Sequence, residues 1–227
     1  MNVPTPEPTS AAAMVRTLGI VATVCGVIIV GAHQGTQEAV AANRRVALER
    51  AVFKVIPSAR SIEEYLVAPG GAIARAGRAE AAPGAIRFYA AFDGGGRLAG
   101  IAAEGAARGY ADTVRIIYGY APGCQCVTGI GVVAMRETPG IGDKILSDRE
   151  FLANFQALDV QLDKNLRALA NAVRTVKHGA KAKPWEIDAI SGATITSRAV
   201  GKAINDSAGV LLPRLVPNID KIRSKAT

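Results

Sequence analysis

Cysteine, histidine and aromatic residues are all scarce in this chain of 227 residues. It contains three Cys, two His and one Trp, and Phe, Trp and Tyr together make up only 5% of its residues. Three Cys cannot form the disulfide framework of a small secreted protein, and three Cys and two His at these spacings do not suit a structural zinc site. The formal net charge is +8, but the basic residues are thinly spread and the aromatics few, which argues against nucleic-acid binding.

Hydrophobic residues are plentiful by comparison. They make up 49% of the chain, enough to fill a core, which excludes disorder as a description of the whole chain. The length leaves room for one domain of roughly 100–150 residues and an additional element.

Charge is absent from residues 18–32, which read LGIVATVCGVIIVGA. We predict a flexible leader over residues 1–13, which include three Pro, and a transmembrane helix over residues 14–33, close to the ~20 residues that cross a bilayer. Arg16 can extend to the lipid headgroups. A cleaved signal peptide is the alternative, because Arg16, the short apolar run and the small residues Gly31 and Ala32 also fit one.

The positive charges that flank this segment are unequal. Arg44, Arg45 and Arg50 follow it, whereas Arg16 alone precedes it. Counted literally, the positive-inside rule leaves the downstream domain in the cytoplasm, although the rule is weak for a large domain.

The rest of the chain divides by composition and periodicity. Residues 34–68 are predicted to be a connecting helical region, because the apolar residues of 38–55 fall near one side of a helix. Residues 69–212 form the main domain, which begins with an Ala- and Gly-rich insertion or loop at 69–85. Residues 213–227 are predicted to be a tail.

Within the main domain, strand patterns precede helix patterns. We predict strands at 86–92, 97–103, 113–120 and 127–135, with turns at 93–96 and 121–126. Residues 149–176 carry apolar residues at intervals of three and four and are predicted to be helical, with one break. This order predicts an α+β fold with a mainly antiparallel sheet and flanking helices.

The most informative segment reads DAISGATITS and runs from Asp188 to Ser197. Small residues at Ser191, Gly192 and Ala193 let the backbone approach a ligand closely. A helix is predicted directly afterwards, with Thr196 or Ser197 as its N-cap. The N–H groups at its start would then suit an anion such as phosphate, although a small-residue turn before a capped helix is also common without any ligand.

This segment resembles the flavinylation motif of the FMN-binding domain family, Asp-x-x-Ser-Gly-Ala-Thr. Asp188, Ser191, Gly192, Ala193 and Thr194 match every defined position. A second block, ETPGIGDK from Glu137 to Lys144, is similar to the Glu-Thr-Pro-Gly-Leu-Gly signature of the same family, with Ile141 in place of Leu. Together with one membrane helix, the two blocks resemble the G-subunit family of Rnf-type electron transport complexes and the related C subunits of sodium-translocating NADH:quinone oxidoreductases.

The resemblance implies that FMN is joined to Thr194 by a phosphoester bond, which a separate flavin transferase makes from FAD with magnesium. The Asp188 carboxylate would be a recognition or orienting group, and Thr196 and Ser197 would cap the helix and donate hydrogen bonds to the phosphate. The turn of Glu137, Thr138, Gly140, Ile141 and Gly142 would line the flavin ring.

The implied function is electron relay, by a single-pass subunit of the cell inner membrane with its C-terminal domain on the periplasmic side. Its partners would be the other subunits of an Rnf-type complex that couples electron transfer between ferredoxin and NAD to ion movement, with no substrate conversion of its own. A C subunit of the quinone reductase, and an anchored module that is never flavinylated, are the alternatives. Two unlinked thiols at Cys124 and Cys126 are favoured over a local disulfide.

Overall fold

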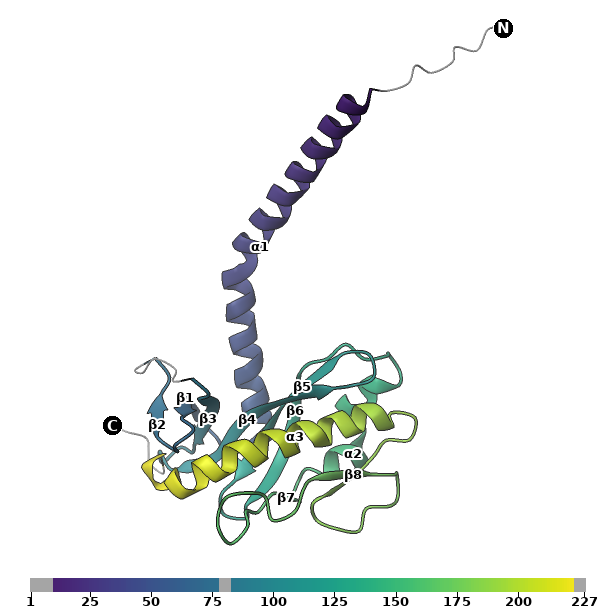
Figure 1. Ribbon diagram of the computed structural model, residues 1–227. Helices are drawn as coiled ribbons and strands as arrows, with labels where there is room; N and C mark the ends of the chain where they lie inside the picture. Colours follow the sequence, from purple (N-terminus) through teal and green to yellow (C-terminus); the bar gives the residue numbers. More distant parts are fainter. Residues whose placement is uncertain (1–9, 78–82, 223–227) are drawn as a thin grey trace. The chain divides into compact units, whose positions relative to one another are not determined.

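The computed structural model describes residues 10–77 and 83–222 (Figure 1). The chain divides into two compact units, residues 1–46 and residues 47–227.

The first unit consists of the greater part of helix α1 (Ala11–Val55). One stretch of it, 11–40, is long and apolar enough to cross a membrane, with a mean hydropathy of 2.2 and none of its most apolar window buried. Within it the hydroxyls of Thr17 and Thr23 donate to the carbonyls of Ala13 and Gly19 at 2.9 and 2.8 Å, so they need no water. These features are compatible with a membrane anchor that contains the predicted span 14–33.

The helix begins earlier than predicted, at Ala11, because Ser10 Oγ accepts a hydrogen bond from the Ala13 N–H at 3.3 Å. Residues 11–13 are therefore helical rather than part of the leader, and residues 1–9 lie outside the described residues. The helix ends at Val55, just before Pro57, whose ring cannot continue it.

The second unit is built on a seven-stranded antiparallel sheet in the order β2-β1-β3-β4-β5-β6-β7. Its strands are β1 (Ser61–Val67), β2 (Ile73–Arg75), β3 (Ile86–Phe92), β4 (Leu98–Arg108), β5 (Thr113–Ala121), β6 (Cys126–Ala134) and β7 (Leu158–Asp159). A separate parallel pair joins β8 (Arg174–Val176) to β9 (Glu186–Asp188). The helical segments are η1 (Gly142–Leu146), α2 (Arg149–Ala153), α3 (Thr194–Leu215) and η2 (Val216–Ile222).

Both faces of the sheet are covered, so alternate residues of a strand enter different cores. On β3, Phe88 joins the main core beneath α3, which lies along one face (Figure 1). Its neighbour Tyr89 joins a smaller core with Val52 and Val55 at the end of α1. The α+β fold with a mainly antiparallel sheet is thus confirmed.

Close packing of α3 on the sheet depends on Gly105 of β4. A Cβ at this position would lie 2.5 Å from the Ala203 carbonyl oxygen, so only glycine lets the helix backbone approach so closely. A partly buried polar contact fixes the same interface, because the Ser207 hydroxyl of α3 hydrogen-bonds to the Tyr118 hydroxyl at 3.0 Å and donates to the Glu104 carbonyl at 2.7 Å.

Four local predictions are wrong. Residues 61–67 form strand β1 rather than the end of a helical region, because Pro57 stops α1 and the side chains of Tyr65 and Val67 then alternate into the core. The 69–85 segment contributes strand β2, which pairs with β1; residues 78–82 lie outside the described part. The 213–227 tail begins inside α3 and continues as η2, where Ile219 and Ile222 are buried.

The fourth error concerns the predicted helix at 149–176, of which only α2 is helical. Asp and Asn side chains take over the backbone hydrogen bonds that a helix would use. Asp159 Oδ1 accepts from the Gln161 N–H and Asp163 Oδ1 from the Arg167 N–H, both at 2.9 Å. The apolar residues of this segment still reach the core, among them Phe155 and Leu158.

A disulfide joins Cys124 and Cys126 in the β5–β6 turn, which corrects the expectation of two unlinked thiols. The intervening Gln125 has a positive φ of 52°, and its carbonyl accepts a hydrogen bond of 3.2 Å from the Val160 N–H. This bond continues the contact between β6 and β7.

Candidate functional site

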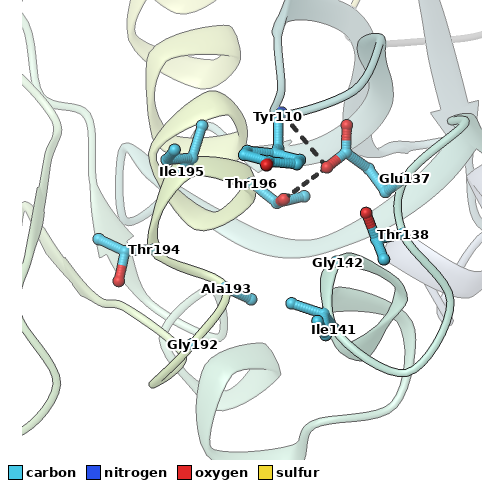
Figure 2. A pocket seen from close by; sticks show the side chains of 10 residues that line it. All are labelled: Tyr110, Glu137, Thr138, Ile141, Gly142, Gly192, Ala193, Thr194, Ile195 and Thr196. Atoms are coloured by element: carbon cyan, nitrogen blue, oxygen red, sulfur yellow. Dashed lines mark hydrogen bonds between the residues drawn. The ribbon is translucent and has the colours of Figure 1, made fainter.

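One pocket of about 510 Å³ brings the two sequence motifs together (Figure 2). Its walls come from the β4–β5 turn, the turn after β6 and the start of α3. The lining residues are Tyr110, Glu137, Thr138, Ile141, Gly142, Gly192, Ala193, Thr194, Ile195 and Thr196. Its volume falls within the range of about 300–1,000 Å³ that is typical of cofactor sites.

The turn after β6 forms one wall. Thr138 O accepts hydrogen bonds from the N–H groups of Ile141 and Gly142 at 3.2 and 2.9 Å, which reverses the chain before η1. Gly140, at the tip of this turn, has a φ of +76°, a conformation that favours glycine. It lies outside the lining, and the turn instead presents Thr138, Ile141 and Gly142 to the pocket.

The N-terminus of α3 forms the opposite wall. Ala193 occupies the N-cap position and no side chain caps the helix, which corrects the prediction that Thr196 or Ser197 is the N-cap. Thr196 and Ser197 lie within the first turn and are buried. The first N–H groups of this 22-residue helix have no partner within it, so they and the positive end of the dipole suit an anion.

The two walls are joined through the Glu137 carboxylate. One oxygen accepts from the Thr196 hydroxyl at 2.7 Å and from the Tyr110 N–H at 3.3 Å, and the other accepts from the Ala111 N–H at 3.1 Å (Figure 2). The Asp112 N–H donates to that second oxygen at 3.3 Å.

These donors decide the charge state of Glu137. Burial raises the pKa of its carboxyl, but the hydrogen bonds from Thr196 and from the three backbone N–H groups outweigh burial and hold the pKa below its ordinary value. Glu137 is therefore ionised and connects the parts of the pocket wall through hydrogen bonds. Both of its carboxylate oxygens accept from protein donors.

Thr194 and Thr196 both line the pocket but differ in availability. The Thr196 side chain is 2% exposed and its hydroxyl proton is given to Glu137. Thr194 is half-buried, and within the described residues its hydroxyl makes no hydrogen bond. Figure 2 shows the Thr194 side chain apart from the Glu137–Thr196 pair.

Four other predicted site residues lie outside the lining: Asp188, Gly140, Ser191 and Ser197. Ser197 Oγ donates to the Ala193 carbonyl at 2.9 Å and accepts from the Ile190 N–H at 3.1 Å, which fixes the loop before α3. Ser191 and Gly192 are exposed in this loop, where Gly192 has a φ of +83°.

Asp188 acts on the neighbouring loop rather than on the pocket. Its carboxylate accepts hydrogen bonds from the N–H groups of Gly179 and Ala180 at 2.9 and 3.2 Å. Its own N–H donates to Asn154 Oδ1 at 3.1 Å. Asn154 is 6% exposed and fully hydrogen-bonded, so it anchors this end of β9.

Two lining residues were missed from the sequence, Tyr110 and Ile195. Together with Ile141 they form an apolar rim whose side chains are 49–67% exposed. No local sequence pattern marks Tyr110, because its turn is held by the Glu137 carboxylate, 27 residues further along the chain. No group of three or more metal-ligating side chains occurs in the described part of the chain.

Residues 109–209 match the FMN-binding domain family. This range contains both motifs and every residue of the pocket lining. The resemblance predicted from the two motifs is therefore confirmed.

Two curated relatives are each named as the G subunit of an ion-translocating oxidoreductase complex. The protein from Pasteurella multocida is 36% identical over 110 residues, which are 47% of this chain and 48% of that protein. The protein from Methanosarcina acetivorans is 30% identical over 122 residues, 54% of this chain and 56% of that protein. The chain thus spans about half the length of the curated relatives it matches.

Two solved structures share the fold. NqrC of Shewanella oneidensis superposes with a TM-score of 0.61 at 21% identity, and covers 79% of this chain and 99% of its own. The C subunit of the Na⁺-translocating NADH-quinone reductase from Parabacteroides distasonis gives a TM-score of 0.59 at 16% identity, over 84% of this chain and 98% of its own. At these identities the likeness shows the fold alone.

Proposed function

We propose that this protein is a membrane-anchored flavoprotein that relays electrons through FMN bound covalently to Thr194. The observation that carries the proposal is the convergence of two motifs, about 50 residues apart in sequence, on one pocket at the N-terminus of α3. The match of residues 109–209 to the FMN-binding domain family supports FMN as the ligand.

The residues of the pocket suit both ends of FMN. The phosphate would lie at the uncapped start of α3, where N–H groups and the helix dipole favour an anion. The flavin ring would lie among Tyr110, Ile141 and Ile195, whose exposed aromatic and aliphatic side chains offer flat apolar contact. Bound FMN would supply the redox chemistry, while the protein sets its position and potential.

Thr194 is the better acceptor for a phosphoester bond on geometric grounds. An attacking hydroxyl must be accessible and able to release its proton. The Thr196 hydroxyl is buried and donates to Glu137, whereas the Thr194 hydroxyl is free of hydrogen bonds in the described part of the chain. A flavin transferase would make the bond and would supply the base or metal that a threonine needs.

The partners would be the other members of an ion-translocating oxidoreductase complex of the Rnf type. The names of the curated relatives support this assembly, and the apolar helix α1 supports its place in a membrane. Covalent attachment would keep the flavin on a domain that presents an open pocket with an exposed rim.

The C-terminal domain is proposed to lie outside the cytoplasm of the cell inner membrane. The Cys124–Cys126 disulfide supports this location, because disulfides persist in oxidising compartments. By the positive-inside rule, Arg44, Arg45 and Arg50 would favour a cytoplasmic domain, but the rule has little influence on a downstream domain of this size.

Covalent flavin attachment is tested by expressing the full chain with and without a flavin transferase. We expect a fluorescent band at about 23.5 kDa on a denaturing gel only when the transferase is present. A folded, membrane-inserted chain that carries no flavin under these conditions would instead identify an anchored module that is never flavinylated.

A further inference from the structure

One segment just before the Thr194 motif contains positive charges and no acidic residue. Between Asp163 and Glu186 there is no acidic residue, yet this stretch contributes six of the protein's positive charges. All six side chains are exposed, and none forms an ion pair within residues 10–77 and 83–222; they are Lys164, Arg167, Arg174, Lys177, Lys181 and Lys183. The acidic neighbour Glu186 uses its carboxylate on the N–H groups of Ala182 and Lys183.

This segment packs against the first turns of α3. The Thr175 hydroxyl of β8 donates to the Ser197 carbonyl at 3.4 Å, and the Thr175 side chain fills the space beside Gly201. Strand β8 also pairs in parallel with β9, where Val176 lies opposite Asp188. The chain therefore leaves β8 at Lys177 next to the loop that carries the motif.

The cationic loop, which we define as residues 177–183, is tied to that motif directly. The Asp188 carboxylate holds the N–H groups of Gly179 and Ala180. Nδ1 of His178 lies 3.2 Å from the Ala189 carbonyl oxygen, and Lys181 Nζ donates to Asn154 Oδ1 at 3.0 Å. The side chains of Lys177 and Lys183 form no hydrogen bond in the described part of the chain. The positive charge of Lys183 acts on the Glu186 carboxylate and contributes to its lowered pKa, whereas Lys177 has no such neighbour among these interactions.

None of the lysines of the cationic loop lines the pocket. Lys177 directly follows Val176, which pairs with Asp188 next to the attachment loop, whereas Lys183 lies near Glu186 at the start of β9. A partner that binds the loop before α3 would therefore lie close to Lys177.

We propose that the cationic loop is the docking surface for the flavin-loading enzyme in its FAD-bound form. This inference rests on the proposed function, covalent attachment of FMN at Thr194. In that reaction Thr194 Oγ attacks the FMN-side phosphorus of FAD, the bond to the adenylate oxygen breaks, AMP leaves, and the hydroxyl proton passes to a base of the enzyme. The donor carries a pyrophosphate with two negative charges, and a positive loop beside the acceptor attracts such a partner and speeds its association.

The test compares two charge-matched double variants. Lys177→Gln/Lys183→Gln removes two charges from the cationic loop and leaves the Lys181–Asn154 bond in place. Lys54→Gln/Arg60→Gln removes two charges from exposed side chains near the end of α1, which packs on the sheet face opposite α3. Both variants have the same net charge, and Thr194 and the pocket lining are untouched in both.

The measurement is the initial rate of covalent FMN incorporation into the full-length protein by purified flavin transferase with FAD and magnesium. At low salt we expect the loop variant to be at least about tenfold slower than wild type, and the control variant to stay within about twofold. The difference should shrink in high salt, because screening weakens steering. Lys177→Arg/Lys183→Arg should restore the rate, because it restores the charge.

Three results would overturn the proposal. An unchanged rate in the folded loop variant, while wild type loads normally, would remove the docking role and leave the proposed function standing. A slow Arg/Arg variant would show that charge is not the cause. Normal loading combined with loss of binding to phosphatidylglycerol vesicles would identify the loop as a membrane-contacting surface instead. If wild type itself never acquires flavin, the proposed function fails first.

Discussion

The Thr196 hydroxyl donates a 2.7 Å hydrogen bond to the Glu137 carboxylate, which lies 59 residues earlier in the chain. The same carboxylate holds the turn that carries Tyr110. One ionised side chain therefore connects three parts of the pocket wall. Because it accepts the hydrogen bond of the Thr196 hydroxyl, the nearest hydroxyl in sequence to Thr194 is already engaged.

Glu137→Gln should destabilise the domain in a pH-dependent manner. The folded-state pKa of Glu137 is below its ordinary value of 4.5, so its ionised form contributes stability above that pH and loses the contribution as pH falls through the folded-state pKa. At pH 7 we expect a loss of about 1–3 kcal/mol in the free energy of unfolding. Urea denaturation from roughly pH 7 down to pH 3 should show the wild type and the variant converging. Glu150→Gln, on an exposed side chain, should show no such convergence, and a constant difference for Glu137→Gln would contradict the assignment.

Gly142→Ala and Gly140→Ala should act by different mechanisms. A Cβ on Gly142 would lie 2.7 Å from Glu137 Cβ and 3.2 Å from Thr196 Oγ1, so it would push the Glu137 and Thr196 side chains apart. We expect Gly142→Ala to lower the free energy of unfolding by about 1–3 kcal/mol and to change the absorbance spectrum of the flavin. Gly140 has open space for a Cβ but a φ of +76°, so its substitution should cost about 1 kcal/mol through backbone strain.

Thermal unfolding and the flavin absorbance spectrum distinguish these two variants. Both should still attach FMN, because Thr194 is elsewhere. A Gly142→Ala protein with the wild-type flavin spectrum and stability would show that the Glu137–Thr196 hydrogen bond tolerates the added methyl group. The bulkier Gly140→Val should affect the ring environment more than Gly140→Ala does; an unchanged spectrum and electron-transfer rate would exclude this turn from the site.

The partly buried hydrogen bond between Tyr118 and Ser207 joins α3 to the sheet and gives a further prediction. Tyr118 is fully buried, and burial raises the pKa of its phenol, so it remains neutral. Ser207→Ala would leave the Tyr118 hydroxyl without its hydrogen-bond partner and should lower the free energy of unfolding by about 1–3 kcal/mol. The double variant Tyr118→Phe/Ser207→Ala removes both hydroxyls and should lose less stability than Ser207→Ala alone. Denaturant unfolding of the three variants measures this, and a double variant that is less stable than Ser207→Ala would refute the reasoning.

The location of the domain can be tested through both its C-terminus and its disulfide. Alkaline phosphatase fused after Thr227 should be active, because this enzyme folds in the oxidising periplasm. In intact cells, Cys124 and Cys126 should resist thiol alkylation until a reductant is added. A stable, membrane-inserted but inactive fusion, together with free thiols at both positions, would place the domain in the cytoplasm.

Four of the seven strands of the sheet were predictable because they carry β-branched and aromatic residues between clear turns, whereas β1, β2 and β7 were not predicted. The strand predicted at 86–92 coincides with β3, and the other three predicted strands overlap β4, β5 and β6. The helix predicted at 149–176 failed because its apolar spacing reflects core contacts of an irregular segment. There Asp159, Asp163 and Asn154 bond to the backbone in place of helical bonds.

The lining of the pocket was predicted where motifs mark it and missed where tertiary contacts alone create it. Both motif blocks were found from local sequence, and eight of their twelve predicted residues line the pocket. Tyr110 enters the pocket because the Glu137 carboxylate holds its turn, a contact across 27 residues that no local pattern encodes. Thr196 was mistaken for a cap because α3 begins earlier than predicted, with Ala193 at the N-cap position.

The central claim is that Thr194, and not Thr196, carries the flavin. The most direct test is peptide mass spectrometry of wild type, Thr194→Ala and Thr196→Ala, each expressed with the flavin transferase. We expect one FMN on the Thr194 peptide in wild type and in folded Thr196→Ala, and none in Thr194→Ala, which should lose only about 1 kcal/mol of stability. FMN retained in Thr194→Ala, or absent from a folded Thr196→Ala, would contradict the account.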